Sequence, residues 1–245
     1  MPRLQNKYQS ESQISYYSFI PQSSRMDLIK HRFPGHERYD PIVRPCAVQD
    51  INCIRRFFAH NSQCSPVYGP IPDPYKLRTL PLQIPHANLS FTLNDITIKG
   101  FNDWKIKTFY VNKETNTLVF EVVFDSLEVL TAEGIIKYRR RGKEPIVVSD
   151  NAFITYNLSL TMTVPYVRNI QLSNAHVYTF LNDAAPISGL GPAFTESKDP
   201  TVIAANAQLL DNIGLSLQEA FVVQGPVFFS IFLQSTICDF RQIKY

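Results

Sequence analysis

Charge is sparse in this sequence, and it is not concentrated on any segment that could bind a polyanion. Charged residues make up 18% of the chain, and the formal net charge is +3. The basic residues are scattered rather than striped, and we interpret the run Arg139–Arg141 as a solvated turn. The sequence therefore gives no indication of a nucleic-acid partner.

Catalytic and metal-binding motifs are missing as well. The chain has no Gly-x-Ser-x-Gly elbow, no glycine-rich phosphate loop and no paired histidines at helical spacing. Its five histidines and four cysteines do not follow the spacing of a zinc site. We predict a protein that is not an enzyme and that holds neither a metal nor a cofactor. An enzyme whose catalytic residues are dispersed along the chain is the alternative.

A secretory signal peptide is not visible either, because residues 1–20 contain no continuous apolar segment. Residues 1–40 are polar and rich in Ser, Gln and Tyr without clear periodicity. We expect them to form an N-terminal arm that is partly disordered or loosely packed, followed by a single domain over residues 41–245. Either a different natural N-terminus or a cytosolic location would explain the missing signal.

The most informative segment that is present lies at the C-terminal end. Apolar residues recur there at the spacing of one helix face, with Asp199 as the N-cap and Pro200 at the first helical position. Gly225 and Pro226 interrupt this pattern. We therefore predict two helical pieces joined by a kink.

This helix carries too few charges to keep one face in water. Between Val202 and Gln234 only Asp211 and Glu219 are charged, so the helix must be largely buried. A transmembrane helix of about 20 apolar residues would also account for this composition. The polar residues inside the window and the lack of a flanking basic cluster argue against that alternative. We predict a helix buried within the protein, and no membrane span.

From residue 87 to residue 181 the apolar period changes to two, which indicates antiparallel strands. The clearest segments are 117–125 and 153–164, each with one apolar face and one mixed or polar face. We expect the proline-rich passage 66–85 to be an extended connector, with a strand pair around 170–181 and a loop over 186–192. The fold class that accommodates both the apolar helix and the alternating strands is α+β, with one long C-terminal helix enclosed by a highly curved antiparallel sheet.

Such an arrangement encloses an elongated apolar interior that can hold a lipophilic molecule. Tyr156 would offer its hydroxyl either to such a ligand or, as the simpler alternative, to a backbone carbonyl. Each inward side chain can equally be ordinary core. The alternation of the strands and the helical spacing predict these ligand-binding residues: Phe120, Val122, Phe124, Ile154, Tyr156, Leu158, Leu160, Met162, Ile213, Leu217, Phe221 and Phe228.

Three of the four cysteines lie close together before the sheet. Cys46 and Cys53 flank Asp50, which is placed to cap a short amphipathic helix. A disulfide between them can staple the entrance of that helix, and it would persist only in an oxidising compartment. Cys64 and Cys238 either pair with each other or stay free.

Two Asn-x-Ser sequons begin at Asn88 and Asn157. Asn157 falls on the polar face of its expected strand. We predict glycosylation at both positions if the chain is secreted.

Several segments, taken in order, resemble the insect Takeout and juvenile hormone-binding protein family. They are Pro45-Cys46 with Asp50 and Cys53, Ile71-Pro72-Asp73-Pro74, Asn88-Leu89-Ser90 with Gly100, Ile136-Lys137-Tyr138 with Gly142, and the helix that carries Asn206. The resemblance covers roughly residue 26 to the end and departs from the family at Ser149-Asp150-Asn151. It implies an α/β-wrap secreted into haemolymph, a disulfide between Cys46 and Cys53, and a lipophilic ligand.

These arguments together predict a carrier that binds a juvenile hormone-like terpenoid or a long-chain fatty derivative in an internal apolar cavity. One alternative is a carotenoid-binding member of the same family. The other is a structural or interaction protein whose core is filled. A large connected cavity would favour a carrier, whereas a closed core with an exposed apolar patch would favour the interaction protein. The oligomeric state is not predicted.

Overall fold

The computed structural model describes residues 40–182 and 187–241, so nearly all of the predicted arm lies outside the described residues. The strands are β1 (Ile42–Val43), β2 (Ser65–Pro66), β3 (Tyr75–Ile84), β4 (Leu89–Lys99), β5 (Trp104–Asn112), β6 (Thr117–Arg140), β7 (Lys143–Pro165), β8 (His176–Leu181), β9 (Ile187–Leu190) and β10 (Cys238–Asp239). The helices are α1 (Ile51–Asn61), α2 (Pro192–Thr195), α3 (Pro200–Asp211) and α4 (Ile213–Phe232). A π-helical turn, Leu233–Ile237, follows α4.

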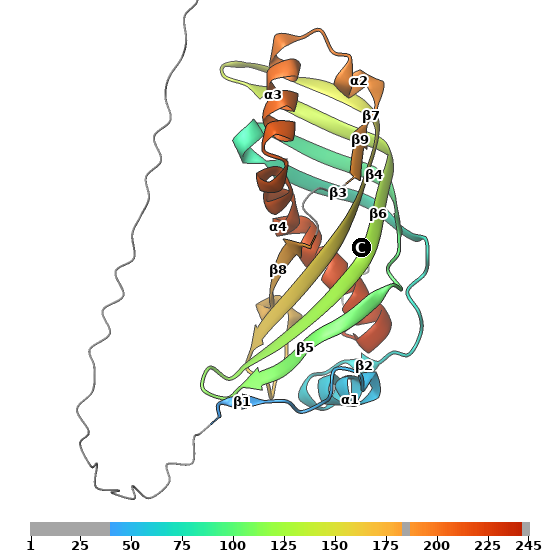
Figure 1. Cartoon of the computed structure of the whole chain (residues 1–245), viewed down its shortest axis with the longest axis vertical. Coiled ribbons are helices and arrows are strands. Elements are labelled where there is room, and N and C mark those ends of the chain that lie inside the picture. The colour runs from blue at the N-terminus through green and yellow to red at the C-terminus, as the bar shows by residue number, and fades with distance from the viewer. Residues whose placement is uncertain (1–39, 183–186, 242–245) are drawn as a thin grey trace, which may run out of the picture. The chain divides into compact units, whose positions relative to one another are not determined.

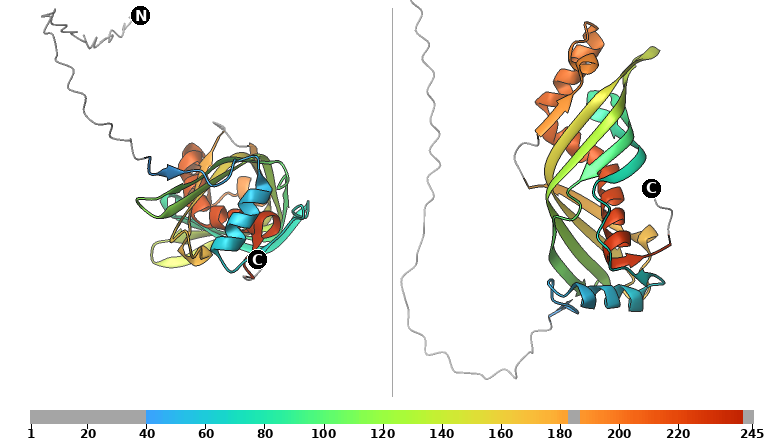
Figure 2. Two further views of the ribbon diagram at one scale, coloured as in Figure 1. Left: turned by 90° about the horizontal axis from the view of Figure 1, so that it is seen from below. Right: turned by 90° about the vertical axis from the view of Figure 1, so that its right-hand side faces the viewer.

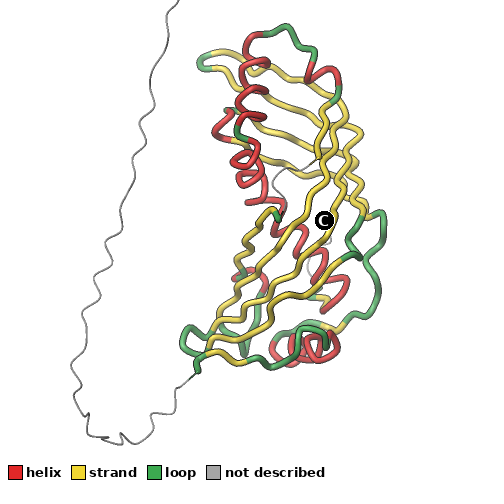
Figure 3. Tube along the Cα trace, viewed as in Figure 1, coloured by secondary structure: helices red, strands yellow, loops and turns green. Residues whose placement is uncertain are grey.

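The spine of the sheet is the long antiparallel hairpin of β6 and β7. β5 pairs with the first half of β6, β4 pairs with its second half, and β3 forms the edge beside β4. β9 pairs with the middle of β7, and β8 pairs with its C-terminal part. The β6–β7 register shifts between Phe124 and Leu127, where β6 also changes its neighbour from β5 to β4. Because a bulge bends a strand and increases its twist, this shift and the further β6–β7 shifts contribute to the curvature of the sheet (Figures 1 and 3).

Helix α4 lies inside the curve of the sheet (Figure 2). It packs against β3 and β8, which are edge strands on opposite sides of the sheet, and so closes the gap between them. The predicted fold class, a curved antiparallel sheet around a long C-terminal helix, is confirmed. The stretch Ile213–Ile237 is long and apolar enough to cross a membrane, but 72% of its apolar window is buried inside the domain, as is typical of a core helix.

The predicted helix caps are present. The Asp50 carboxylate accepts a hydrogen bond from the Cys53 backbone N–H at 2.9 Å, at the start of α1. The Asp199 carboxylate accepts one from the Thr201 N–H at 2.7 Å, at the start of α3. Each satisfies a backbone donor that the first turn leaves unpaired.

The predicted interruption of the helix at Gly225-Pro226 is wrong. The chain breaks instead at Asn212, between α3 and α4, and α4 continues through Pro226. A proline removes the bond to the carbonyl four residues earlier, which here belongs to Val222. Both Pro226 and Val222 are exposed, so water can satisfy that carbonyl and the helix continues.

Three other predicted segments differ from the structure. The second half of the expected proline-rich connector is strand β3, which tolerates Pro81 because it is an edge strand. A single strand, β8, replaces the expected pair around residues 170–181, after a short 3₁₀ turn at Leu172–Asn174. The expected loop over residues 186–192 contains β9, which pairs with β7.

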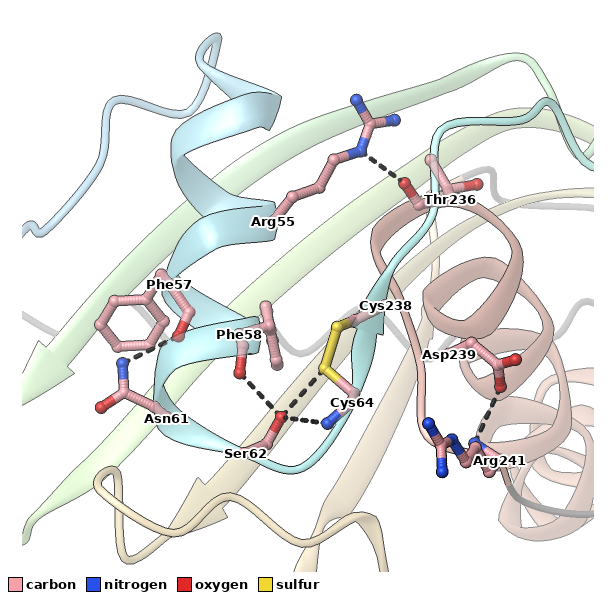
Figure 4. The surroundings of a disulfide bond; sticks show 10 residues. All are labelled: Arg55, Phe57, Phe58, Asn61, Ser62, Cys64, Thr236, Cys238, Asp239 and Arg241. Carbon is pink, nitrogen blue, oxygen red and sulfur yellow. Dashed lines mark hydrogen bonds between the residues drawn. A yellow bond between two sulfur atoms is a disulfide. The ribbon is translucent and has the colours of Figure 1, made fainter.

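Both possible disulfides form, so all four cysteines are bonded. Cys46–Cys53 fixes the entrance of α1, and Cys64–Cys238 joins the segment after α1 to the end of the C-terminal helix (Figure 4). Beside the second bond, the Arg55 Nε–H donates to the Thr236 carbonyl at 2.9 Å. Helix α1 is thus attached to the C-terminal end of the core by a covalent bond and a buried hydrogen bond.

Candidate functional site

An apolar pocket of about 130 Å³ lies where the junction of α3 and α4 faces the inner side of the sheet. β3, β4, β6, β7 and β9 contribute its walls, and α3 and α4 contribute its helical side. The lining residues are Leu82, Ile84, Phe91, Leu93, Val129, Thr131, Ala152, Phe153, Ile154, Tyr156, Ser188, Leu190, Leu209, Leu210, Ile213, Ser216, Leu217, Ala220 and Gln224. No charged side chain is among them.

Four of the predicted ligand-binding residues line this pocket: Ile154, Tyr156, Ile213 and Leu217. Phe221 lies beside it, with its ring 5.7 Å from the ring of Tyr156 in an edge-to-face arrangement. The structure places the other seven in the closed core away from the pocket, each with no exposed surface: Phe120, Val122, Phe124, Leu158, Leu160, Met162 and Phe228.

That part of the core is filled by aromatic rings. Phe124 packs edge-to-face on Phe232, and Phe101 makes the same contact with both Phe124 and Phe228. Phe120 packs on Phe232 at a tilt. Centroid separations of 5.7–6.1 Å are those of rings in direct contact. These contacts close this part of the core, and the apolar pocket lies at the end nearest the α3–α4 junction.

The pocket carries one buried polar pair. The Tyr156 hydroxyl donates to the Gln224 side-chain oxygen at 3.1 Å, and both side chains are buried. Burial raises the pKa of Tyr156 far above its usual value, so its hydroxyl stays protonated. The partner of this hydroxyl is a side chain of α4, whereas the sequence analysis offered a ligand or a backbone carbonyl.

A second polar group lies at the start of α4 and was not predicted. His86 Nδ1 is 2.8 Å from the Glu219 carboxylate, and His86 Nε2 is 3.3 Å from the Ser216 hydroxyl. The order Ser–His–Glu is that of a catalytic triad, but the Ser216 hydroxyl donates to the Leu209 and Asn212 carbonyls, at 2.9 and 3.1 Å. The Leu209 carbonyl is one that the end of α3 leaves unpaired, and the Asn212 carbonyl also accepts from the Ser216 backbone N–H at 3.0 Å. We therefore interpret the group as a structural brace. Glu219, as one of two charges in a buried helix, was the sequence signal that a partner was needed.

The helical segment is largely buried, as expected, but the outer sides of α3 and α4 carry exposed apolar residues that the sequence analysis did not predict. Ile203, Leu210, Leu215 and Val222 are 54%, 57%, 45% and 74% exposed. Leu210 also lines the pocket, so this apolar surface reaches the pocket mouth. We call these four residues the outer stripe. The only exposed charge on either helix is Asp211.

Comparison with known proteins identifies the family. The model of the fibroin P25 family matches residues 42–242, which is most of the chain. The chain belongs to the fibroin P25 family. A curated relative, fibrohexamerin from Galleria mellonella, is 26% identical over 209 residues, which cover 81% of this chain and 89% of that protein. Fibroin P25 proteins are not enzymes, and neither is this chain.

A solved structure, Takeout 1 from Epiphyas postvittana, is similar to this chain with a TM-score of 0.40 and 14% identity. The match covers 72% of this chain and 95% of Takeout 1. The family shown is thus fibroin P25 rather than the Takeout and juvenile hormone-binding family expected from the sequence. Juvenile hormone binding and a haemolymph location do not follow from this family membership.

The part of the chain that the structure describes contains no group of three or more His, Cys, Asp or Glu side chains able to hold a metal ion. The residues around the pocket can bury an apolar group and offer it an amide or a hydroxyl. The chemistry they support is binding.

Proposed function

We propose that this chain is a secreted, silk-associated interaction protein that binds other polypeptides, silk fibroin among them, without a covalent link. The observation that carries this proposal is a filled core combined with an exposed, nearly uncharged apolar surface on α3 and α4. Exposed apolar surface of this kind is typical of protein–protein contact sites. Membership of the fibroin P25 family and similarity to a fibrohexamerin support a role in silk.

Secretion is supported by the cysteines. Two disulfides that consume every cysteine of the chain are stable only in an oxidising compartment. No free thiol is left in this sequence for a disulfide to a partner, which supports non-covalent attachment. Association would then rest on apolar contact, which the outer stripe offers.

The size of the pocket argues against a carrier for long lipophiles. Ligand pockets for drug-sized molecules enclose about 300–1,000 Å³, whereas this one encloses about 130 Å³. A juvenile hormone-like terpenoid, a long fatty derivative or a carotenoid would need the space that the rings of Phe120, Phe124 and Phe228 occupy. Carrier function for a small apolar molecule is the second candidate, and Ile154, Tyr156, Ile213 and Leu217 are the residues proposed to contact it.

Gel filtration of native protein from its source tests the proposal. We expect the chain to elute with fibroin in a complex, and to separate from fibroin in detergent without a reducing agent. Elution at the mass of the free chain would contradict the proposal. A complex that resists detergent until reductant is added would contradict non-covalent attachment.

A further inference from the structure

We propose that the apolar pocket is the anchor site of the exposed apolar surface on α3 and α4, and that it accepts one aromatic side chain from an uncharged segment of a polypeptide partner. The inference rests on the proposed function and adds the place of contact and the chemistry of the group bound there. It concerns the pocket mouth at Leu210 and the neighbouring outer stripe.

The size of the pocket identifies what it can receive. A dry cavity of about 150 Å³ binds benzene, and the pocket here encloses about 130 Å³. That is room for the ring of one Phe or Tyr side chain and too little for a long chain. Interfaces between proteins are commonly held by a few such aromatic anchors in desolvated pockets.

The lining suits such a ring. Leu93, Val129 and Leu217 supply apolar contact, and the buried Tyr156–Gln224 pair supplies the polar group nearby. A phenol hydroxyl from the partner could hydrogen-bond to the Gln224 amide, so Tyr fits as well as Phe. A charged side chain would find no counter-ion in this lining and would be strongly disfavoured.

Charge complementarity identifies the partner segment. The pocket mouth is apolar at Leu210, and Leu215 and Val222 add exposed apolar surface on α4. The Glu219 carboxylate on the same helix is already held by His86 at 2.8 Å. The remaining exposed charge on α3 and α4 is Asp211. A segment that packs here without burying an unpaired charge must itself be uncharged around its aromatic residue.

Plugging the pocket tests the inference. The Ala220→Phe variant places a ring inside the pocket from α4, and Ala152→Leu fills it from β7, in case the first variant does not fold. Ala204→Phe is the matched control, because Ala204 is exposed on α3 and does not line the pocket. Thermal unfolding identifies the plugged variant that keeps the fold.

Binding to purified silk fibroin is then measured by co-sedimentation in the analytical ultracentrifuge. We expect the wild type and Ala204→Phe to bind alike, and the folded plugged variant to bind at least tenfold more weakly. Equal binding by the plugged variant would overturn the anchor site and leave the proposed function standing. If the wild type does not bind fibroin, both fail.

A capped peptide, Gly-Ser-Gly-Tyr-Gly-Ser-Gly, tests the chemistry of the bound group by NMR titration. We expect it to shift resonances of residues lining the pocket, whereas the same peptide with Ala in place of Tyr, and hexadecanoic acid, leave them unchanged. Tight binding of hexadecanoic acid in the pocket would overturn the inference in favour of a lipid. A wild-type dimer that the plugged variant dissociates would overturn it in favour of a second copy.

Discussion

Tyr138 links the sheet to the start of the C-terminal helices through a single side chain. Its hydroxyl donates to the Asn206 side-chain oxygen at 2.9 Å, and the Asn206 amide donates to the Phe194 carbonyl at 2.7 Å. β6, α3 and α2 are thus joined at the end of the domain that contains the pocket. Tyr138 itself has no exposed surface, and burial raises its pKa from 10.0 to about 12.

Tyr138→Phe should lower the free energy of unfolding at pH 7 by about 1–2 kcal/mol, because it leaves the Asn206 oxygen without its donor. The pH dependence adds a second expectation. The pKa of Tyr138 is higher in the folded state than in the unfolded state, so the protonated hydroxyl contributes its full stability to the wild type below pH 10. This contribution to stability is lost as the pH rises through about 12. In urea unfolding at pH 7, 10 and 11.5, the difference in free energy of unfolding between wild type and variant should become smaller as the pH rises. A constant difference would contradict the burial of the Tyr138 hydroxyl that raises its pKa.

The two sequons differ in how accessible they are. Asn88 is exposed at the corner before β4 in a left-handed conformation, with φ 55°. Asn157 is half-buried within β7, its side-chain oxygen is shielded from solvent, and its backbone carbonyl accepts from the Asn182 N–H at 3.0 Å.

We therefore expect glycosylation at Asn88 and not at Asn157, although the sequence predicted both. In protein secreted from insect cells, removal of N-glycans should change the electrophoretic mobility of the wild type and of Asn157→Gln. Asn88→Gln should show no such change. A mobility change that persists in Asn88→Gln would contradict this expectation.

At the scale of elements, the contact between α4 and β8 depends on Gly225. A Cβ atom at this position would lie 2.0 Å from the Thr179 hydroxyl oxygen and 3.3 Å from the Thr179 Cβ. The helix can approach the strand this closely only because glycine has no side chain.

Gly225→Ala should lower the free energy of unfolding by about 1–3 kcal/mol through this overlap. Gly214→Ala is the matched control in the same helix, since a Cβ there meets nothing within 4 Å. Its effect should be neutral or stabilising by up to about 1 kcal/mol because alanine favours the helix. Thermal or urea unfolding measures both, and equal effects of the two substitutions would contradict the close contact.

The two disulfides constrain loops of very different length. Cys46 and Cys53 are 7 residues apart, whereas Cys64 and Cys238 are 174 residues apart. In the chain-entropy model the short loop stabilises the fold by about 2.5 kcal/mol and the long one by about 5 kcal/mol. Cys64→Ala/Cys238→Ala should therefore destabilise the protein more than Cys46→Ala/Cys53→Ala in urea unfolding. The reverse order would show that packing around α1 outweighs loop length.

Local signals made several elements predictable and left their neighbours unpredicted. The caps at Asp50 and Asp199, and the alternation around Phe120 and Leu158, depend on residues a few positions apart. Whether a strand continues through Pro81 and a helix through Pro226 depends on tertiary context, because Pro81 lies on an edge strand and Pro226 on the exposed side of a helix. The break at Asn212 has a local signal, an Asn followed closely by Gly214, which the sequence analysis did not use.

The candidate site was predicted only in part for a related reason. Alternation shows which side chains point inward, so Tyr156 and Leu217 could be placed inside, but it does not show how much space is left between them. Ring contacts between Phe124 and Phe232 close that space, and they join segments more than a hundred residues apart. The exposure of the outer stripe follows from how α3 and α4 pack against the sheet, which the spacing of apolar residues in the sequence does not predict.

For the whole molecule, we propose that the chain binds polypeptides rather than long lipophiles. Native mass spectrometry of the protein from its natural source, in non-reducing buffer, tests this most directly. We expect a mass that includes fibroin subunits and no bound lipid, with the subunits released on collisional activation. A free chain that carries a stoichiometric terpenoid, fatty acid or carotenoid would contradict it.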